Sequence, residues 1–396
     1  MRRALFQTFR NFYPRPGLSV RHKGSRSSKD ADAAAASPLR RLLDEATAYG
    51  EPATPAEDPE MRWATQPYTT RPSEEPIDPR VDPRETTVLL FPGQGSQQVG
   101  MGKELMKVPT ARDLYQLASS VVGWDVARVC TEGPGEELAR RCQTAVMVTS
   151  LAALERVRDE RPSALERVRA VAGFSLGEIT ALVFAGALTF EGALRLVELR
   201  AAAMSAASAE RPGGMLTVWL SADARLGPAL YAAREYATKQ GVESPVCQVA
   251  NYLFPGCKVI AGDEEALRYL ERQGNTYGVK RAARVRVEGA FHTPLMARAE
   301  AAVATALRSV DVREPGVRVM SCVDAHAYGD VRDVRRRVAK LTTRAVRWEQ
   351  TLHALYARPR GEKFPLTLAL GPGGALRSTL RQVNAPAWDS SVQIDV

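Results

Sequence analysis

The sequence predicts an α/β fold in which a large, mostly parallel sheet carries a smaller inserted domain. Two observations predict it. From residue 86 onward, short apolar strand patterns alternate with helical patterns, which is typical of parallel sheets covered by helices. Within residues 213–288 the order becomes β-α-β-β-α-β, the order of a ferredoxin-like unit. We therefore expect a discontinuous large domain at 86–212 and 289–390, and a small domain at 213–288.

The large domain begins with a buried strand at 87–91, which a Gly-rich loop at 92–102 follows. Hydrophobic periodicity predicts the remaining elements. The expected helices are 111–121, 143–157, 176–187, 190–207 and 348–356, and the expected strands are 170–174, 317–323 and 365–370.

The small domain shows the same kinds of signal at shorter spacing. The expected strands are 215–220, 246–252, 258–261 and 283–287, and the expected helices are 223–239 and 263–272. A small domain on a larger one forms a cleft, and a cleft is the usual place for a ligand.

The net charge of +9 comes almost entirely from the first 29 residues, which hold eight basic residues and no acidic one. Without them the chain has 46 basic and 45 acidic residues. This Arg-rich and Ser-rich segment, with interspersed aromatic residues, is typical of a mitochondrial transit peptide. The alternative is a basic arm that binds nucleic acid, but the balanced remainder makes nucleic acid an unexpected partner.

Residues 30–85 are acidic and Pro-rich, and they predict a linker. No apolar run is long enough to span a membrane. The five cysteines are scattered, with no CxxC pair and no histidine at metal-ligand spacing. We therefore expect free thiols and no metal site.

The strongest chemical motif is the GxSxG sequence at 173–177, centred on Ser175. It lies between a predicted strand and a predicted helix, where a nucleophilic serine stands on a tight turn that needs glycine on both sides. This context favours a nucleophile over an ordinary turn serine. It also predicts that the large domain is α/β-hydrolase-like.

A serine nucleophile needs a base, and three histidines lie outside the leader. His353 falls on a predicted helix, and His326 falls in a polar loop. His292 follows a predicted strand at the junction of the two domains. Position therefore favours His292, with His326 as the alternative.

The loop that begins at Gly93 and Gln94 has two interpretations. It follows a strand like a phosphate-binding turn, but it lacks the third glycine of that motif. Alternatively, its backbone amides line an oxyanion hole beside Ser175.

Arg200 lies on the apolar face of the helix at 190–207, so its charge is expected to point inward. A buried arginine needs an anion. The sequence leaves open whether that anion is a structural carboxylate or a ligand.

Together these motifs resemble malonyl-CoA:acyl carrier protein transacylases. The matching segments are FPGQGSQ at 91–97, GFSLGE at 173–178, ANYLFPG at 250–256, GAFH at 289–292 and GPG at 371–373. The similarity covers residues 86–385 in order. With the basic leader and the linker, the chain is most similar to the stand-alone mitochondrial enzymes of animals.

The resemblance implies a role for each of eight residues. Ser175 would be acylated, with His292 as its base, and Arg200 would pair with the malonyl carboxylate. The amides of Gln94 and Leu176 would form the oxyanion hole. The substrate pocket would include Gln143, Phe291 and Asn251, and the base would be oriented by a backbone carbonyl near Arg347.

The implied reaction moves malonyl from coenzyme A to the phosphopantetheine thiol of an acyl carrier protein, in the mitochondrial matrix, with no cofactor. One rival function is a serine hydrolase or thioesterase, although such folds usually place an acid between the serine and the histidine. Another is a non-catalytic acyl-CoA-binding or RNA-binding module, against which the presence of Ser175 and His292 argues.

Overall fold

A computed structural model describes residues 82–287 and 289–396. Residues 69–396 form one compact unit, which contains all of them. The predicted leader at 1–29 lies outside the described residues, as does the linker up to residue 81. Among the described residues, no helix combines the length and the apolar character that crossing a membrane requires.

The large sheet has five parallel strands in the order β10-β9-β1-β2-β7. Its central strand, β1, is the continuous apolar run TVLLF, and all five of its residues are buried, as expected for a strand covered on both faces. The bounds are β1 Thr87–Phe91, β2 Val168–Gly173, β7 Arg318–Met320, β9 Leu366–Leu370 and β10 Ser391–Ile394.

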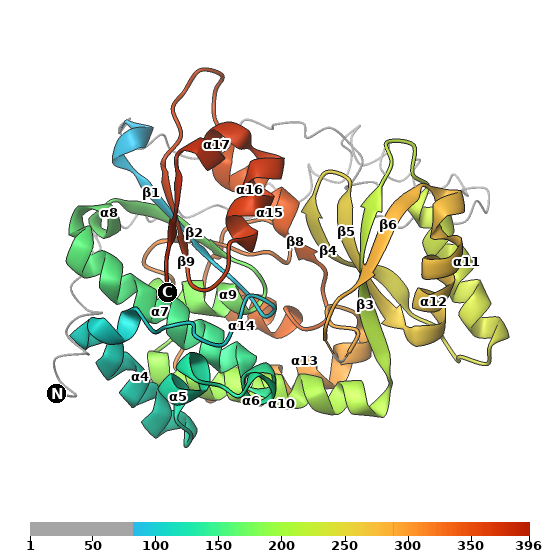
Figure 1. The fold of residues 1–396 in the computed structure, drawn as a ribbon, viewed down its shortest axis with the longest axis horizontal. Coiled ribbons are helices and arrows are strands. Elements are labelled where there is room, and N and C mark those ends of the chain that lie inside the picture. The colour runs from blue at the N-terminus through green and yellow to red at the C-terminus, as the bar shows by residue number, and fades with distance from the viewer. Residues whose placement is uncertain (1–81, 288) are drawn as a thin grey trace, which may run out of the picture. The chain divides into compact units, whose positions relative to one another are not determined.

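Helices cover this sheet and carry most of the core (Figure 1). Before the small sheet they are α4 Pro109–Val122, α5 Val126–Thr131, α6 Gly135–Arg140, α7 Cys142–Glu160, α8 Pro162–Glu166, α9 Leu176–Phe184 and α10 Phe190–Glu210. After it they are α13 Ala297–Ala306, α14 Val331–Lys340, α15 Trp348–Tyr356, α16 Ala375–Val383 and α17 Ala385–Asp389. Thr189 caps α10 by accepting a hydrogen bond from the N–H of Gly192.

The small sheet has the strand order β6-β3-β5-β4-β8. Neighbouring strands are antiparallel except for β8, which pairs parallel to β4. The bounds are β3 Gly213–Leu220, α11 Leu226–Lys239, β4 Cys247–Phe254, β5 Cys257–Asp263, α12 Glu264–Gln273, β6 Val279–Arg284 and β8 Val346–Arg347. Figure 1 shows β8 and α15 between this sheet and the large one.

The strand predicted at 283–287 is wrong, because β6 spans Val279–Arg284. Its sequence, VKRAAR, has little apolar character, which suits its place at the edge of the small sheet as the described strands form it. Pairing with β3 defines it instead. The large sheet also continues past residue 390, because β10 adds to β9. Neither feature depends on a local hydrophobic pattern.

Candidate active site

Ser175 stands on a strained turn between β2 and α9. Its backbone has a φ of 52°, which a non-glycine residue seldom adopts. A Cβ on Gly173 would lie 1.9 Å from the carbonyl carbon of Gly177, and one on Gly177 would lie 2.1 Å from the carbonyl oxygen of Phe91. Both glycines of the motif are therefore required by backbone crowding. The turn places the serine hydroxyl at the N-terminus of α9.

The Gly-rich loop packs directly against this turn. A Cβ on Gly93 would lie 2.4 Å from the carbonyl oxygen of Phe174. The next residue, Gln94, and the first residue of α9, Leu176, each have a backbone N–H that donates no hydrogen bond within the described residues. Two free amide donors therefore lie close to the nucleophile turn in sequence and in packing, as an oxyanion hole requires.

Arg200 is buried, with a relative exposure of 1%, and it points at the serine. Its Nη2 donates to Ser175 Oγ at 3.0 Å, and its Nη1 donates to Gln143 Oε1 at 2.5 Å. Its Nε has no hydrogen-bond partner, and no carboxylate forms an ion pair with it in the described part of the chain. Burial lowers the pKa of Arg200 to about 10, so the guanidinium stays charged at neutral pH.

Gln143 connects Arg200 to the Gly-rich loop. It is buried at the start of α7, and its Nε2 faces Gln94 Oε1 at 3.3 Å while its Oε1 accepts from Arg200. The side chain thus orients the guanidinium toward Ser175. It supports this part of the site without bringing a charge of its own.

His292 is buried and also has a strained backbone, with a φ of 63°. In the described residues its backbone makes two hydrogen bonds: its N–H donates to the carbonyl of Thr342 at 3.0 Å, and its carbonyl accepts from Gln248 Nε2 at 3.3 Å. Burial and the nearby charge of Arg200 lower the pKa of His292 to about 3. The ring is therefore neutral at physiological pH.

Arg200 contacts Ser175 directly, and its charge also acts on His292. In the described residues, the Ser175 hydroxyl is hydrogen-bonded to Arg200 and not to His292. The alternative base, His326, is exposed, and its Nδ1 contacts the carbonyl of Asp324. His353 lies on α15. The structure therefore brings His292, and neither alternative, together with the arginine.

The remaining two pocket residues lie on the small-sheet side. Phe291 packs against two clusters, one around Met215 and one around Met204. Asn251 is buried on β4, and its Oδ1 has no hydrogen-bond partner among the described residues. Within the described residues, Asn251 makes no side-chain hydrogen bond to Ser175, His292 or Arg200. The orienting carbonyl expected near Arg347 stays a prediction.

Sequence reasoning assigned no role to Glu178, which is fully buried in the first turn of α9. Its carboxylate accepts from the N–H of Cys322 at 2.6 Å and from the hydroxyl of Tyr328. Burial raises its pKa. Sequence reasoning also assigned no role to Gln248, which holds the backbone of His292. Glu178 could have been found as the last residue of the GxSxGE motif, whereas no local sequence pattern marks Gln248.

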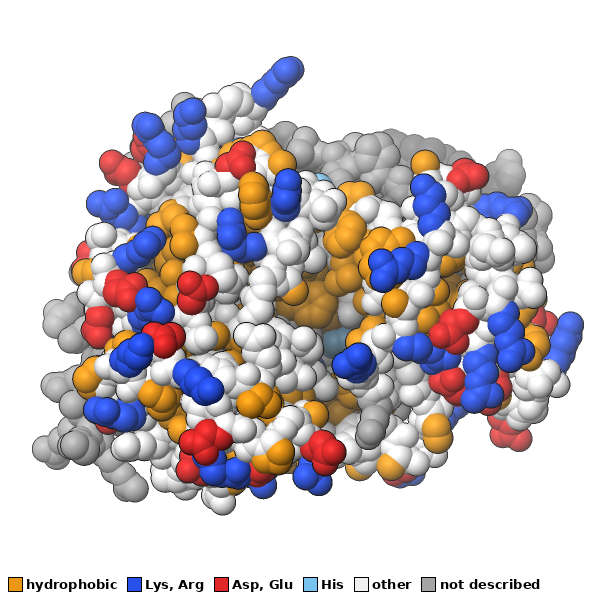
Figure 2. All heavy atoms as spheres, viewed as in Figure 1, with side chains coloured by type: hydrophobic (Ala, Val, Ile, Leu, Met, Phe, Trp, Pro, Cys, Tyr) orange, Lys and Arg blue, Asp and Glu red, His pale blue; other side chains and the backbone are white. Residues whose placement is uncertain are grey.

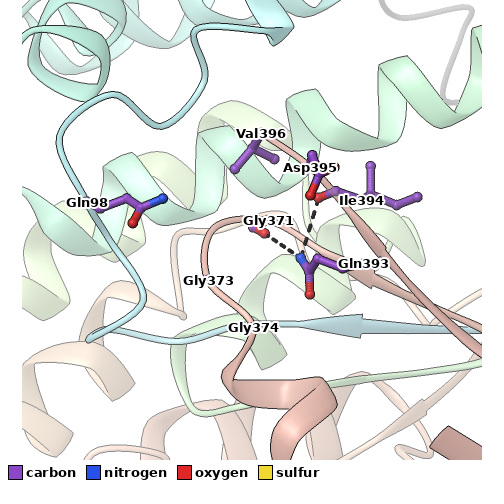
Figure 3. Close-up of a pocket in the computed structure, with 8 residues that line it drawn as sticks. All are labelled: Gln98, Gly371, Gly373, Gly374, Gln393, Ile394, Asp395 and Val396. Atoms are coloured by element: carbon purple, nitrogen blue, oxygen red, sulfur yellow. Dashed lines mark hydrogen bonds between the residues drawn. The ribbon is translucent and has the colours of Figure 1, made fainter.

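The surface is hollowed between the elements of the two sheets, and hydrophobic side chains line much of the hollow (Figure 2). A separate cavity of about 220 Å³ lies at the ends of β9 and β10. Figure 3 shows Gln393 there, with its Nε2 donating to the carbonyls of Gly371 and Ile394. The cavity also touches Gln98 of the Gly-rich loop, and Ser175 is not among the residues that line it. Within residues 82–287 and 289–396, no group of three potential metal ligands comes together.

Comparison with known proteins gives consistent results. The family model described as "Acyl transferase domain" matches residues 88–358. A Drosophila melanogaster protein, the probable mitochondrial malonyl-CoA-acyl carrier protein transacylase, is 45% identical over 353 residues, which are 89% of this chain and 93% of that protein. The Homo sapiens mitochondrial malonyl-CoA-acyl carrier protein transacylase is 44% identical, over 79% of this chain and 81% of its own length.

Among solved structures, the malonyl CoA-acyl carrier protein transacylase of Coxiella burnetii superposes with a TM-score of 0.71 at 27% identity. The match covers 80% of this chain and 95% of that one. The α/β fold with a mostly parallel sheet is therefore confirmed, and so is the resemblance found in the motifs. The chain belongs to the acyl transferase domain family and, within it, to the malonyl-CoA-acyl carrier protein transacylases.

Proposed function

We propose that this protein transfers a malonyl group from malonyl-CoA to the phosphopantetheine thiol of an acyl carrier protein, through an acyl-Ser175 intermediate. One observation carries the proposal. Arg200 is a buried cation with no carboxylate partner in the described residues, and it donates directly to the hydroxyl of Ser175. A substrate with a free carboxylate next to its reacting carbonyl supplies the missing anion.

In the first half-reaction, the substrate carboxylate takes the donors of Arg200 and releases the serine hydroxyl. Ser175 Oγ then attacks the thioester carbonyl while His292 accepts its proton. The amides of Gln94 and Leu176 hold the tetrahedral oxyanion, and each is worth about 3 kcal/mol of barrier. The C–S bond breaks, the thiol of coenzyme A leaves with the proton, and malonyl remains on Ser175.

The second half-reaction is the reverse with another thiol. The phosphopantetheine thiol of the carrier protein gives its proton to His292 and attacks the acyl-serine carbonyl. The C–O bond to Ser175 then breaks, His292 returns the proton to Ser175 Oγ, and malonyl leaves on the carrier thiol. The reaction needs no metal or redox cofactor, and it predicts ping-pong kinetics. The partners are therefore a coenzyme A thioester and the acyl carrier protein.

Substrate binding also strengthens the base. The charge of Arg200 is one cause of the low pKa of His292. A bound malonyl carboxylate neutralises that charge, so the pKa of His292 rises toward its ordinary value when the substrate is in place. Gln143 keeps the guanidinium directed at the substrate. We assign Phe291 and Asn251 to the wall of the acyl pocket on the small-sheet side.

We also propose a location and a domain organisation. The names of the animal relatives and the basic segment at 1–29 support a mitochondrial protein, placed in the matrix, with the linker at 30–85. The β-α-β-β-α-β order supports a ferredoxin-like unit at 213–288. The strand–turn–helix around Ser175 supports an α/β-hydrolase-like domain at 86–212 and 289–390.

A serine hydrolase is the second candidate, since water could release the acyl group. The buried Arg200 favours transfer of a charged acyl group, because a hydrolase of neutral esters gains nothing from a buried cation. A non-catalytic acyl-CoA-binding or RNA-binding module does not explain the strained Ser175 and His292.

The decisive experiment maps the acylated residue. The protein is incubated with radiolabelled malonyl-CoA, digested, and analysed for the labelled peptide, with and without holo acyl carrier protein. We expect label on Ser175 that moves to the carrier protein when it is added, and no label in Ser175→Ala. Label that persists in the alanine variant would remove Ser175 from the mechanism, and loss to water alone would favour the hydrolase.

A further inference from the structure

The nucleophile and the base of the proposed reaction lie on separate parts of the fold, and different contacts hold each of them in place. His292 is held through its carbonyl by Gln248 of β4. Ser175 follows Phe174, whose ring packs edge-on against Trp348 of α15, with centroids 5.6 Å apart and an interplanar angle of 70°. His292 is also held by the bond from its N–H to the carbonyl of Thr342, which follows α14. The distance from Ser175 to His292 therefore depends in part on how the small sheet sits against α15.

A buried ion pair joins those two elements. Lys258 of β5 donates to Glu349 of α15, with 2.5 Å between Nζ and Oε2, and the two side chains are only 5% and 3% exposed. Lys258 also donates to the carbonyl of Phe254 at 3.2 Å, and its ammonium lies over the ring of Tyr252. Glu349 directly follows Trp348, the residue that braces the nucleophile turn.

The backbone reinforces the same junction. Just before α15, β8 pairs parallel to β4, with Asn251 opposite Val346 and Tyr252 opposite Arg347. One short segment, residues 346–349, thus contacts β4, β5 and the nucleophile turn. A displacement there would move His292 relative to Ser175.

We propose that Lys258 and Glu349 are positioning residues for acyl transfer, and that their ion pair keeps Ser175 and His292 at reacting distance. This inference rests on the proposed function. A buried ion pair contributes little net stability compared with apolar side chains of similar size, because both charges lose their hydration. An ion pair has a defined direction and length, so it fixes the position of the small sheet against α15 better than an apolar contact, whose surfaces can slide over one another. A small misplacement of reacting groups is costly in rate.

The test compares the double variant Lys258→Met, Glu349→Leu with the wild type. Removing both charges avoids an unpaired buried ion, so the fold is expected to survive, as checked by circular dichroism and thermal unfolding. We expect kcat for malonyl transfer to fall about 10- to 100-fold while KM for malonyl-CoA changes less than about threefold. Rapid-quench measurement should place the loss in acylation of Ser175.

A control within the small domain is the pair Arg284 and Glu271, which joins β6 to α12 at 2.7 Å. Both side chains are about one-third exposed, and Arg284 also pairs with Glu264 of α12. Arg284→Met with Glu271→Leu should leave kcat unchanged. If the double variant at 258 and 349 did not fold, Glu349→Gln would decide, because it removes the ion pair but keeps a neutral acceptor for Lys258, and a smaller loss in kcat is expected.

A folded double variant in which Ser175 is acylated at the wild-type rate would contradict the positioning role of Lys258 and Glu349. A rise in KM without a fall in kcat would also contradict that positioning role. Both results differ from failure of the proposed function, in which the wild type itself would not form acyl-Ser175.

Discussion

At the scale of single residues, Arg200 decides what the site can accept. Its guanidinium has two donors committed to Ser175 and Gln143, and a third, Nε, with no partner among the described residues. A cation held in this way is prepared for an anion that arrives with the substrate. Selectivity for a charged acyl group would then come from this residue.

We predict that Arg200→Ala weakens malonyl transfer by about 2–4 kcal/mol, or roughly thirty- to a thousandfold in kcat/KM, because a desolvated charge pair is lost. Acetyl-CoA has no carboxylate and should be affected little, so the preference between the two donors should invert. Arg200→Lys should rescue malonyl transfer only in part, since lysine lacks the planar fork.

The measurement is kcat/KM for both donors, with Arg195→Ala as a control, because Arg195 is an exposed arginine on the same helix. Equal loss of both donors in a folded Arg200→Ala protein would make Arg200 a scaffold residue.

His292 predicts a pH dependence of stability. Its pKa is about 3 in the folded protein and near 6.5 in an unfolded chain. Between those values the unfolded chain binds one more proton than the folded one, so stability falls as the pH drops below 6.5. The upper limit is about 1.4 kcal/mol per pH unit, or about 2 kcal/mol between pH 6.5 and 5.

Urea unfolding of the wild type and of His292→Gln at pH 6.5 and pH 5 measures the contribution of His292 to the pH dependence of stability. The wild type should lose more stability on acidification than the glutamine variant does. Parallel losses in the two proteins would mean that His292 is not the neutral, buried group described above.

At the scale of elements, the turn between β2 and α9 is the most constrained part of the site. Gly173→Ala should destabilise the protein by about 3 kcal/mol or more, because the added Cβ would lie within 2 Å of the backbone of Gly177. Such overlap cannot be relieved by a side-chain rotation. Thermal unfolding should show a clearly lower midpoint, together with loss of acyl-enzyme.

Gly374→Ala is the matched control for that substitution. Gly374 is the N-cap of α16, its φ is −98°, and no atom lies within 4 Å of an added Cβ. It should cost less than about 1 kcal/mol. Similar losses at the two positions would show that glycine flexibility, and not crowding, explains the requirement at Gly173.

At the scale of the whole molecule, the charge asymmetry of the chain predicts its destination. Residues 1–35, which contain all eight basic residues of the leader, should carry a fluorescent protein into mitochondria. The same fusion with Arg2, Arg3 and Arg10 changed to Gln should stay in the cytosol. Nuclear accumulation of the unmodified fusion would favour the basic arm that binds nucleic acid.

Features with a local physical cause could be predicted from the sequence. The strand at Thr87–Phe91 and the helix at Trp348–Tyr356 have the predicted bounds, because a continuous apolar run and a helical period are both local signals. The GxSxG turn also follows from local crowding of the backbone. Family membership followed from these motifs taken in order.

The sequence by itself therefore determined the α/β alternation, the nucleophile turn and the inward direction of Arg200. Only the tertiary structure decided what Arg200 faces, that His292 rather than His326 lies beside it, and that Gln143 and Gln248 hold the two. It also decided β6, which pairing with β3 defines. The physical reason is common to all of these: each depends on contacts between residues far apart in the chain, and such contacts leave no period or motif in the local sequence.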